Sequence, residues 1–113
     1  MALPISVDYE IYAGDTFTEV IQYNGTGDLV GATARCQLRA NVTTATETLS
    51  VTPTIDDVAK TVTLTLTSAE TQQLVTTTTT KSSHVYDIEI TFSDATVETI
   101  QHGKMTTTLD VTR

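Results

Sequence analysis

The chain has 113 residues, with fourteen acidic and six basic side chains, so it is long enough for one domain and carries a net charge of −8. This charge argues against nucleic acid or an anionic membrane surface as the partner, because both are bound through clustered Lys and Arg side chains. The 27 Thr residues favour strands over helices, since β-branched side chains fit a pleated sheet well. Because the chain has no Trp and only two Phe, its core must be built mainly from Val, Ile, Leu and Tyr.

Most of the chain alternates between apolar and polar residues, which is the period of a half-buried β-strand. In chain order, the alternating stretches and their predicted inward residues are 5–11 (Ile5, Val7, Tyr9, Ile11), 16–23 (Phe17, Ile21, Tyr23), 31–39 (Ala32, Ala34, Cys36, Leu38), 61–67 (Val62, Leu64, Leu66), 84–92 (Tyr86, Ile88, Ile90, Phe92) and 104–112 (Met105, Leu109, Val111). Val20 points away from Phe17 and Ile21, which suggests that the second stretch is contacted on both faces.

Three further features interrupt this alternation. Leu49, Val51 and Ile55 predict one short strand broken by Pro53, which lacks a ladder donor and favours an edge or a bulge. In the stretch 96–101, Val97 faces opposite to Ile100, and we expect "HG" at 102–103 to break or bulge the strand. Residues 76–83, "TTTTTKSS", read as a mobile loop, with a polar edge strand as the alternative.

One short helical turn is expected inside this β-rich pattern. The residues "TSAE" at 67–70 match a capping box, in which the Thr hydroxyl and the Glu carboxylate each accept a backbone N–H bond. The turn runs from Ser68 to about Leu74, and Leu74 closes one end of the core. About seven strands and this turn predict an all-β, immunoglobulin-like antiparallel β-sandwich, a single domain over residues 1–113.

The N-terminal "MALPISVDYE" has no basic region followed by an apolar run, so we expect no signal peptide. No apolar stretch approaches the roughly 20 residues that a membrane helix needs. The single cysteine, Cys36, excludes an internal disulfide and a thiolate metal cluster. Its alternating neighbours make it a small core residue rather than a nucleophile.

Few side chains suggest chemistry. Asp56 and Asp57 would supply too few oxygens for Ca²⁺, and a solvated turn is favoured. His84 and His102 lie near strand ends with no third ligand at a suitable spacing, so structural or solvent-facing roles are favoured. Asp87 and Glu89 share the outward face of one strand, whereas a catalytic carboxylate pair needs two distinct environments. We therefore predict no catalytic residue, no cofactor and no metal, and a protein that is not an enzyme.

Five stretches together resemble a known family. "AGDTFTEVIQY", "GDLVGATARCQLR", "VTLTLTSAETQQL", "VYDIEITFSD" and "HGKMTTTLDVTR" recur, in that order, in small immunoglobulin-like modules of tailed-bacteriophage virion proteins. The chain is similar to the amino-terminal domain of BppU-type baseplate upper proteins over nearly its whole length. The fibre or receptor-binding extension of larger members is missing here, so the module would be the entire protein, which favours an adaptor over host recognition.

The resemblance implies a structural protein of the virion, made in the bacterial cytoplasm, that acts as an assembly or adaptor module in the tail, baseplate, neck or fibre attachment. Its implied partners are other virion proteins and copies of itself in a symmetric ring or trimer. Contacts through edge strands and Thr-rich faces would be weak singly and strong in many copies. The alternatives are a capsid decoration protein on the phage head and, less favoured for want of exposed aromatic residues, a carbohydrate-binding adhesin module.

Overall fold

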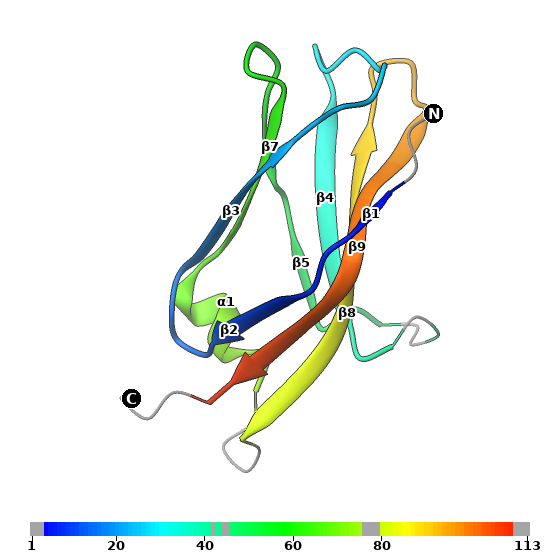
Figure 1. Cartoon of the computed structure of the whole chain (residues 1–113). Helices are drawn as coiled ribbons and strands as arrows, with labels where there is room; N and C mark the ends of the chain where they lie inside the picture. The colour runs from blue at the N-terminus through cyan, green and yellow to red at the C-terminus, as the bar shows by residue number, and fades with distance from the viewer. Residues whose placement is uncertain (1–3, 42, 44–45, 76–79, 110–113) are drawn as a thin grey trace.

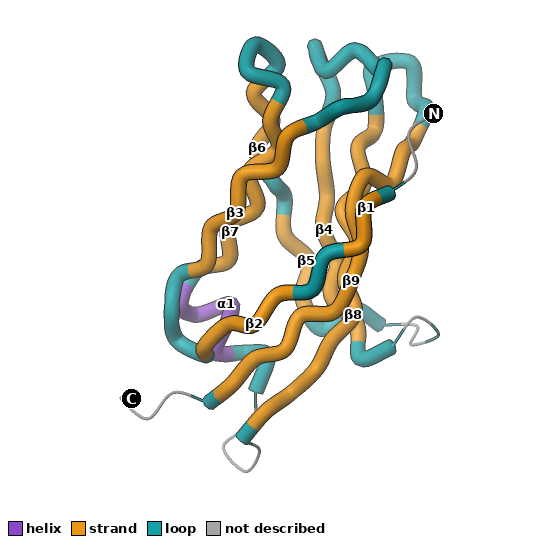
Figure 2. Tube along the Cα trace, viewed as in Figure 1, coloured by secondary structure: helices purple, strands orange, loops and turns teal. Residues whose placement is uncertain are grey.

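A computed structural model describes residues 4–41, 43, 46–75 and 80–109. Two sheets pack face to face as a β-sandwich (Figures 1 and 2). The elements, in chain order, are β1 (Ile5–Ser6), β2 (Tyr9–Tyr12), β3 (Phe17–Gln22), β4 (Thr33–Arg39), β5 (Leu49–Val51), β6 (Thr54–Asp56), β7 (Thr61–Leu66), α1 (Ser68–Gln72), β8 (Lys81–Thr91) and β9 (Val97–Thr108).

The six-stranded sheet has the order β1-β9-β8-β4-β5, with β2 also paired to β9, and the three-stranded sheet has the order β3-β7-β6. This division, with β3, β6 and β7 opposite β4, β8 and β9, is that of an immunoglobulin-like sandwich, which confirms the predicted fold class. One departure from the prediction lies at the N-terminus, where β1 and β2 run parallel to β9 rather than antiparallel.

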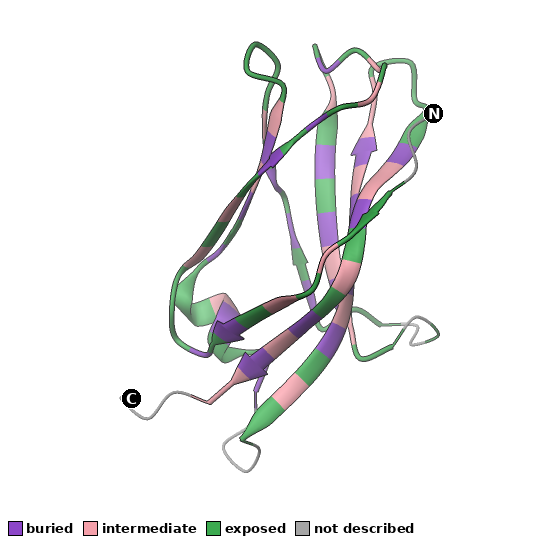
Figure 3. Ribbon diagram, viewed as in Figure 1, coloured by how far each residue is buried: buried purple, intermediate pink, exposed green. Residues whose placement is uncertain are grey.

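The core lies between the sheets and is made of the inward residues of the alternating stretches. Buried and exposed positions alternate along β4 and β8 in Figure 3. Most of the predicted inward residues are buried, which confirms the period of two. The largest completely buried apolar side chains are Leu38, Val62, Leu64, Leu66, Ile88, Ile90 and Met105.

Several local predictions were wrong. Ile5 on β1 is 52% exposed, and Val20 on the outward face of β3 is 58% exposed, so neither side chain joins the core. Leu49–Ile55 is two strands rather than one: Pro53 lies where the chain crosses from the six-stranded sheet (β5) to the three-stranded sheet (β6). Leu109 is only partly buried.

The loop prediction for residues 76–83 was wrong for its last three residues. Lys81, Ser82 and Ser83 begin β8 and pair with Thr108, Thr107 and Thr106 of β9. Residues 76–79 lie outside the described ranges, as does Val111.

The capping box is present, and α1 ends at Gln72, two residues earlier than predicted. The amide of Glu70 donates to the Thr67 hydroxyl (3.2 Å), and the amide of Thr67 donates to the Glu70 carboxylate (2.9 Å). Leu74 is buried as expected. Within the described ranges, no helix has the length and apolar character needed to span a bilayer.

We expect Thr67→Ala to lower the free energy of unfolding by about 1 kcal/mol, because the amide of Glu70 loses its acceptor. Thr67→Ser keeps the hydroxyl and should be close to wild type. Urea unfolding followed by circular dichroism measures both. Equal stabilities for the Ala and Ser variants would contradict a stabilising role for the cap.

Candidate functional site

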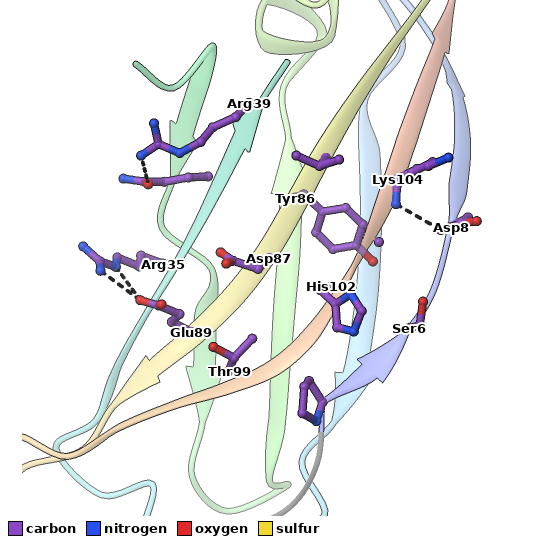
Figure 4. A pocket seen from close by; sticks show the side chains of 14 residues that line it. Ser6, Asp8, Arg35, Arg39, Tyr86, Asp87, Glu89, Thr99, His102 and Lys104 are labelled. Carbon is purple, nitrogen blue, oxygen red and sulfur yellow. Dashed lines mark hydrogen bonds and ion pairs between the residues drawn. The ribbon is translucent and has the colours of Figure 1, made fainter. Parts of the chain in front are cut away.

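The outward side of the six-stranded sheet forms a groove of about 840 Å³ (Figure 4). Its lining residues come from β4, β8 and β9 and from the N-terminal segment. We call this surface the charged face; it consists of Ser6, Asp8, Arg35, Gln37, Arg39, Val85, Asp87, Glu89, Thr99, His102 and Lys104.

Strand register arranges these side chains in rows across the sheet. In the central row, Asp87 lies between Gln37 of β4 and His102 of β9, and His102 in turn pairs with Ser6 of β1. The two flanking rows are Arg35, Glu89 and Thr99 on one side, and Arg39, Val85 and Lys104 on the other. Residues that lie far apart in the sequence therefore become direct neighbours.

A β-bulge at Ile100 keeps β9 in phase with these rows. Ile88 pairs with Gln101 and Glu89 pairs with Thr99, so Ile100 is the extra residue. The bulge lies two residues before the predicted position at His102–Gly103, through which β9 runs without a break. The extra residue puts Thr99 and His102 on the outward side while Glu98 and Gln101 remain buried.

Ion pairs and hydrogen bonds hold the Arg side chains of the charged face in place. Arg35 contacts the Glu89 carboxylate through both Nη2 and Nε at 2.9 Å. Arg39 donates to the Gln37 side-chain oxygen at 2.9 Å, and its guanidinium lies 3.8 Å from the Glu47 carboxylate. Exposed pairs of this kind add little to stability, but they fix the direction in which each charge points.

Asp87 is the central anion of the charged face. Partial burial in the groove raises the pKa of its carboxyl, and the neighbouring Glu89 carboxylate raises it further. Arg35, Arg39 and His102 act in the opposite direction. A carboxylate with a raised pKa gains from any additional cation brought to it, because the cation offsets part of the lost hydration.

The charges of this face form stripes of alternating sign, one stripe on each strand. Arg35 and Arg39 make β4 positive, Asp87 and Glu89 make β8 negative, and Lys104 makes β9 positive. The N-terminal segment adds Asp8 as a fourth, negative stripe. These three cations and three anions balance, so the remaining eleven acids and three bases give the rest of the chain its whole net charge of −8.

Beneath this surface, a network of hydrogen bonds fixes the N-terminal segment to β9. The Tyr86 hydroxyl donates to the carbonyl of Val7 (2.7 Å), and the amide of Val7 donates to the carbonyl of His102 (2.9 Å). The Asp8 carboxylate accepts the amide of Lys104 (3.0 Å). The network therefore sets the position of the Asp8 stripe relative to β9.

The two histidines lie on opposite sides of the same sheet. His102 belongs to the charged face and is exposed, as expected for a solvent-facing residue. His84 is 7% exposed on the inward side, and its Nδ1 has no hydrogen-bond partner in the described part of the chain. Burial lowers the pKa of His84, so the ring is neutral near pH 7 and acts as a core residue.

We expect this burial to make stability depend on pH. Below about pH 6.5 the unfolded chain protonates His84 while the folded chain resists protonation, so the free energy of unfolding decreases as the pH falls. A His84→Leu variant should lose less stability than wild type between about pH 7 and about pH 5. Chemical denaturation at each pH measures this; equal losses would show that another group is responsible.

The other candidate residues do not assemble a reactive centre. The Asp56 carboxylate accepts the amides of Val58 and Ala59 (both 3.0 Å) and caps the β6–β7 turn. Cys36 is completely buried, and burial raises the pKa of its thiol to about 12. No group of three or more His, Cys, Asp or Glu side chains that could hold a metal ion occurs in the residues that the structure describes.

A smaller hollow of about 330 Å³ lies between the β3–β4 and β8–β9 loops. At its base, the Tyr23 hydroxyl donates to the buried Glu98 carboxylate (3.0 Å) and accepts the amide of Gly27 (3.0 Å). A Cβ at Gly27 would collide with the ring of Phe92. A Cβ at Gly25 would likewise meet the ring of Tyr23, so both glycines of the β3–β4 loop are explained by the folding of this loop over two aromatic rings.

The sequence revealed the outward positions of the charged face but not the face itself. Arg35, Gln37 and Arg39 alternate with core residues, and Asp87 and Glu89 do the same. The signal that was missing is strand order, because only the sequence of neighbours β4-β8-β9-β1 turns these separate sets into stripes.

Fold and site together define an immunoglobulin-like β-sandwich that presents a charge-patterned sheet face. No family model matches the chain. A search of curated proteins likewise found no similar protein.

Proposed function

We propose that this protein is a non-enzymatic assembly module of a tailed-bacteriophage virion that joins structural parts in the tail, baseplate, neck or fibre attachment. The observation that carries an assembly role is the charged face: a broad sheet surface with side chains fixed by ion pairs and no net charge. Such a surface suits a macromolecular partner, because rows of fixed charges select register and orientation.

The virion context rests on the five resembling stretches. They fall on the structural elements that build the sandwich and its charged face: β4 with Arg35 and Arg39, β8 with Asp87, and β9 with His102 and Lys104. The same stretches also include the capping box of α1. A single set of residues thus underlies both the resemblance and the proposed contact surface.

A second surface supports the assembly role. The outward side of the three-stranded sheet is rich in Thr, at Thr18, Thr54, Thr63 and Thr65. Thr hydroxyl groups can form hydrogen bonds with a partner and Thr methyl groups can contact it, without making the free subunit prone to aggregate. The net charge of −8 keeps isolated subunits apart, so association would depend on many copies being presented together.

The test is to find the chain in particles. Antibodies raised against the purified chain should label the tail, neck or baseplate of virions of the phage whose genome encodes it, in negative-stain images. Label over the head would replace this proposal by the capsid decoration role. Absence of the chain from purified particles, by mass spectrometry, would refute both.

A further inference from the structure

We infer that the charged face binds the charged face of a second copy of this chain, about a two-fold axis that runs parallel to the strands between β8 and β9. This inference deepens the proposed assembly function by naming the partner of that face. The alternating stripes carry it, because their order across the sheet determines how two copies can meet.

The stripe order is positive on β4, negative on β8, positive on β9 and negative at Asp8. Rotation by 180° about an axis along the strands reverses this order, so that β4 faces the N-terminal segment of the second copy and β8 faces its β9. Every stripe then lies opposite a stripe of the other sign, and within the rows the formal charges brought face to face are those of Arg39 and Asp8. Rotation about the perpendicular axis in the sheet would instead place each stripe against itself, so like charges would repel.

Strand register makes the pairing specific to individual residues. Asp87 and His102 lie in the same row and on either side of the axis, so Asp87 of each copy faces His102 of the other. The flanking row ends with Arg39 on one side and, beyond Lys104, with Asp8 on the other. Arg39 of each copy therefore faces Asp8 of the other, and the symmetry forms each contact twice.

The shape of the sheet is compatible with this pairing. A twisted sheet is saddle-shaped, and a rotation of 180° about an axis lying in it along the strands returns the same saddle. Two such faces can pack about 10 Å apart, and a two-fold axis along the strands keeps the strands of the two copies parallel. The groove therefore does not prevent contact between two copies.

The sheet edges are less suitable for self-association. β5 and β6 have three residues each, and the edge formed by β1 and β2 is interrupted between Ser6 and Tyr9. The remaining edge strand, β3, carries Glu19 on the side of Phe17 and Ile21, toward the core. Short edges, interruptions and inward charges are the features that suppress edge-to-edge pairing.

Local charge also favours the charged face. Two copies that each carry −8 repel one another wherever acidic surfaces meet. The charged face is balanced, so it can approach its copy without that repulsion. The charged block spans three inter-strand spacings and four residues, roughly 14 Å each way. The area of this block is smaller than the roughly 800 Å² that each partner buries in a stable interface. The isolated pair is therefore weak and forms at high micromolar concentration.

Sedimentation of the purified chain over a concentration series tests the inference. We expect a monomer–dimer equilibrium that is weaker at about 0.5 M than at about 0.05 M NaCl, because salt screens the stripes. Arg39→Glu and Asp8→Lys should each weaken dimerisation at least about tenfold, since the symmetry repeats each repulsion.

A mixture of these two variants should dimerise again. In the mixed pair, the carboxylate introduced by Arg39→Glu in one copy faces the ammonium group introduced by Asp8→Lys in the other. The second contact is the native one, because each copy retains the residue that the other has lost. Charge reversal on both sides of the axis therefore restores attraction at both contacts.

The controls separate charge from folding. Lys60→Glu makes the same kind of charge change in the β6–β7 turn, outside the face, and should leave dimerisation unchanged. Asp8→Asn keeps an acceptor for the amide of Lys104 and should weaken dimerisation less than Asp8→Lys. Thermal melting shows whether each variant is folded.

A wild-type chain that is monomeric at millimolar concentration in low salt would overturn the inference. So would a dimer unaffected by Arg39→Glu, or a mixture that associates no better than either variant alone. These measurements use the purified chain, so their failure leaves the proposed virion role untouched, whereas absence from particles would refute that role and leave the dimer standing.

Discussion

Leu64→Asp is expected to abolish cooperative folding. Leu64 is completely buried at the centre of β7, the middle strand of the three-stranded sheet. The carboxylate would leave a cavity and bury a charge without a partner, at a cost of several kcal/mol. A domain of this size has a total stability of only about 5–15 kcal/mol. Circular dichroism during heating should show no sharp transition.

A neighbouring residue supplies the matched control. Thr65→Asp places the same side chain one residue further along β7, on the exposed face, and should change the free energy of unfolding by only about 0.5 kcal/mol. Leu64→Ala removes the apolar contacts without adding a charge, and should cost about 2–5 kcal/mol. A soluble Leu64→Asp variant that melts cooperatively would refute the assignment of this strand face to the core.

Gly103→Ala is expected to detach the N-terminal segment from β9. A Cβ at Gly103 would collide with the carbonyl of Val7, which accepts the Tyr86 hydroxyl. The backbone must therefore move away, and both this bond and the Val7–His102 bond are lost. We expect a loss of roughly 2–4 kcal/mol in the free energy of unfolding, together with faster hydrogen exchange of the Val7 amide.

Lys104→Ala is the control for this variant, because it truncates the next residue of β9 at an exposed position. It should leave the exchange of the Val7 amide unchanged. Full protection of that amide in Gly103→Ala would show that the segment can accommodate a methyl group, and the close approach would then not explain the glycine.

Much of the fold could be predicted because one face of each long strand packs against the apolar core. Alternation identified Cys36, Leu64 and Ile88 as inward residues, and all three are completely buried. The capping box of α1 could also be predicted, since its two residues, Thr67 and Glu70, lie within four residues of the chain. Such features depend on neighbours along the chain, which the sequence shows directly.

The errors share another cause, namely contacts between distant residues. The bulge at Ile100 depends on the pairing of β8 with β9, and Gly103 is explained only by the chain at Val7. The charged face is a product of strand order in the same way. Nothing near Arg39 in the sequence indicates that Lys104 and Asp8 complete its row.

The parallel pairing of β1 and β2 with β9 has a mechanical consequence. The first and last strands are neighbours, with six residue pairs in register, and they point in the same direction (Figure 1). Tension applied at the two ends of the chain would load this ladder in shear, so its hydrogen bonds would resist together rather than unzip one at a time. This ladder between β1, β2 and β9 would therefore be the first part of the sandwich to bear such a pull.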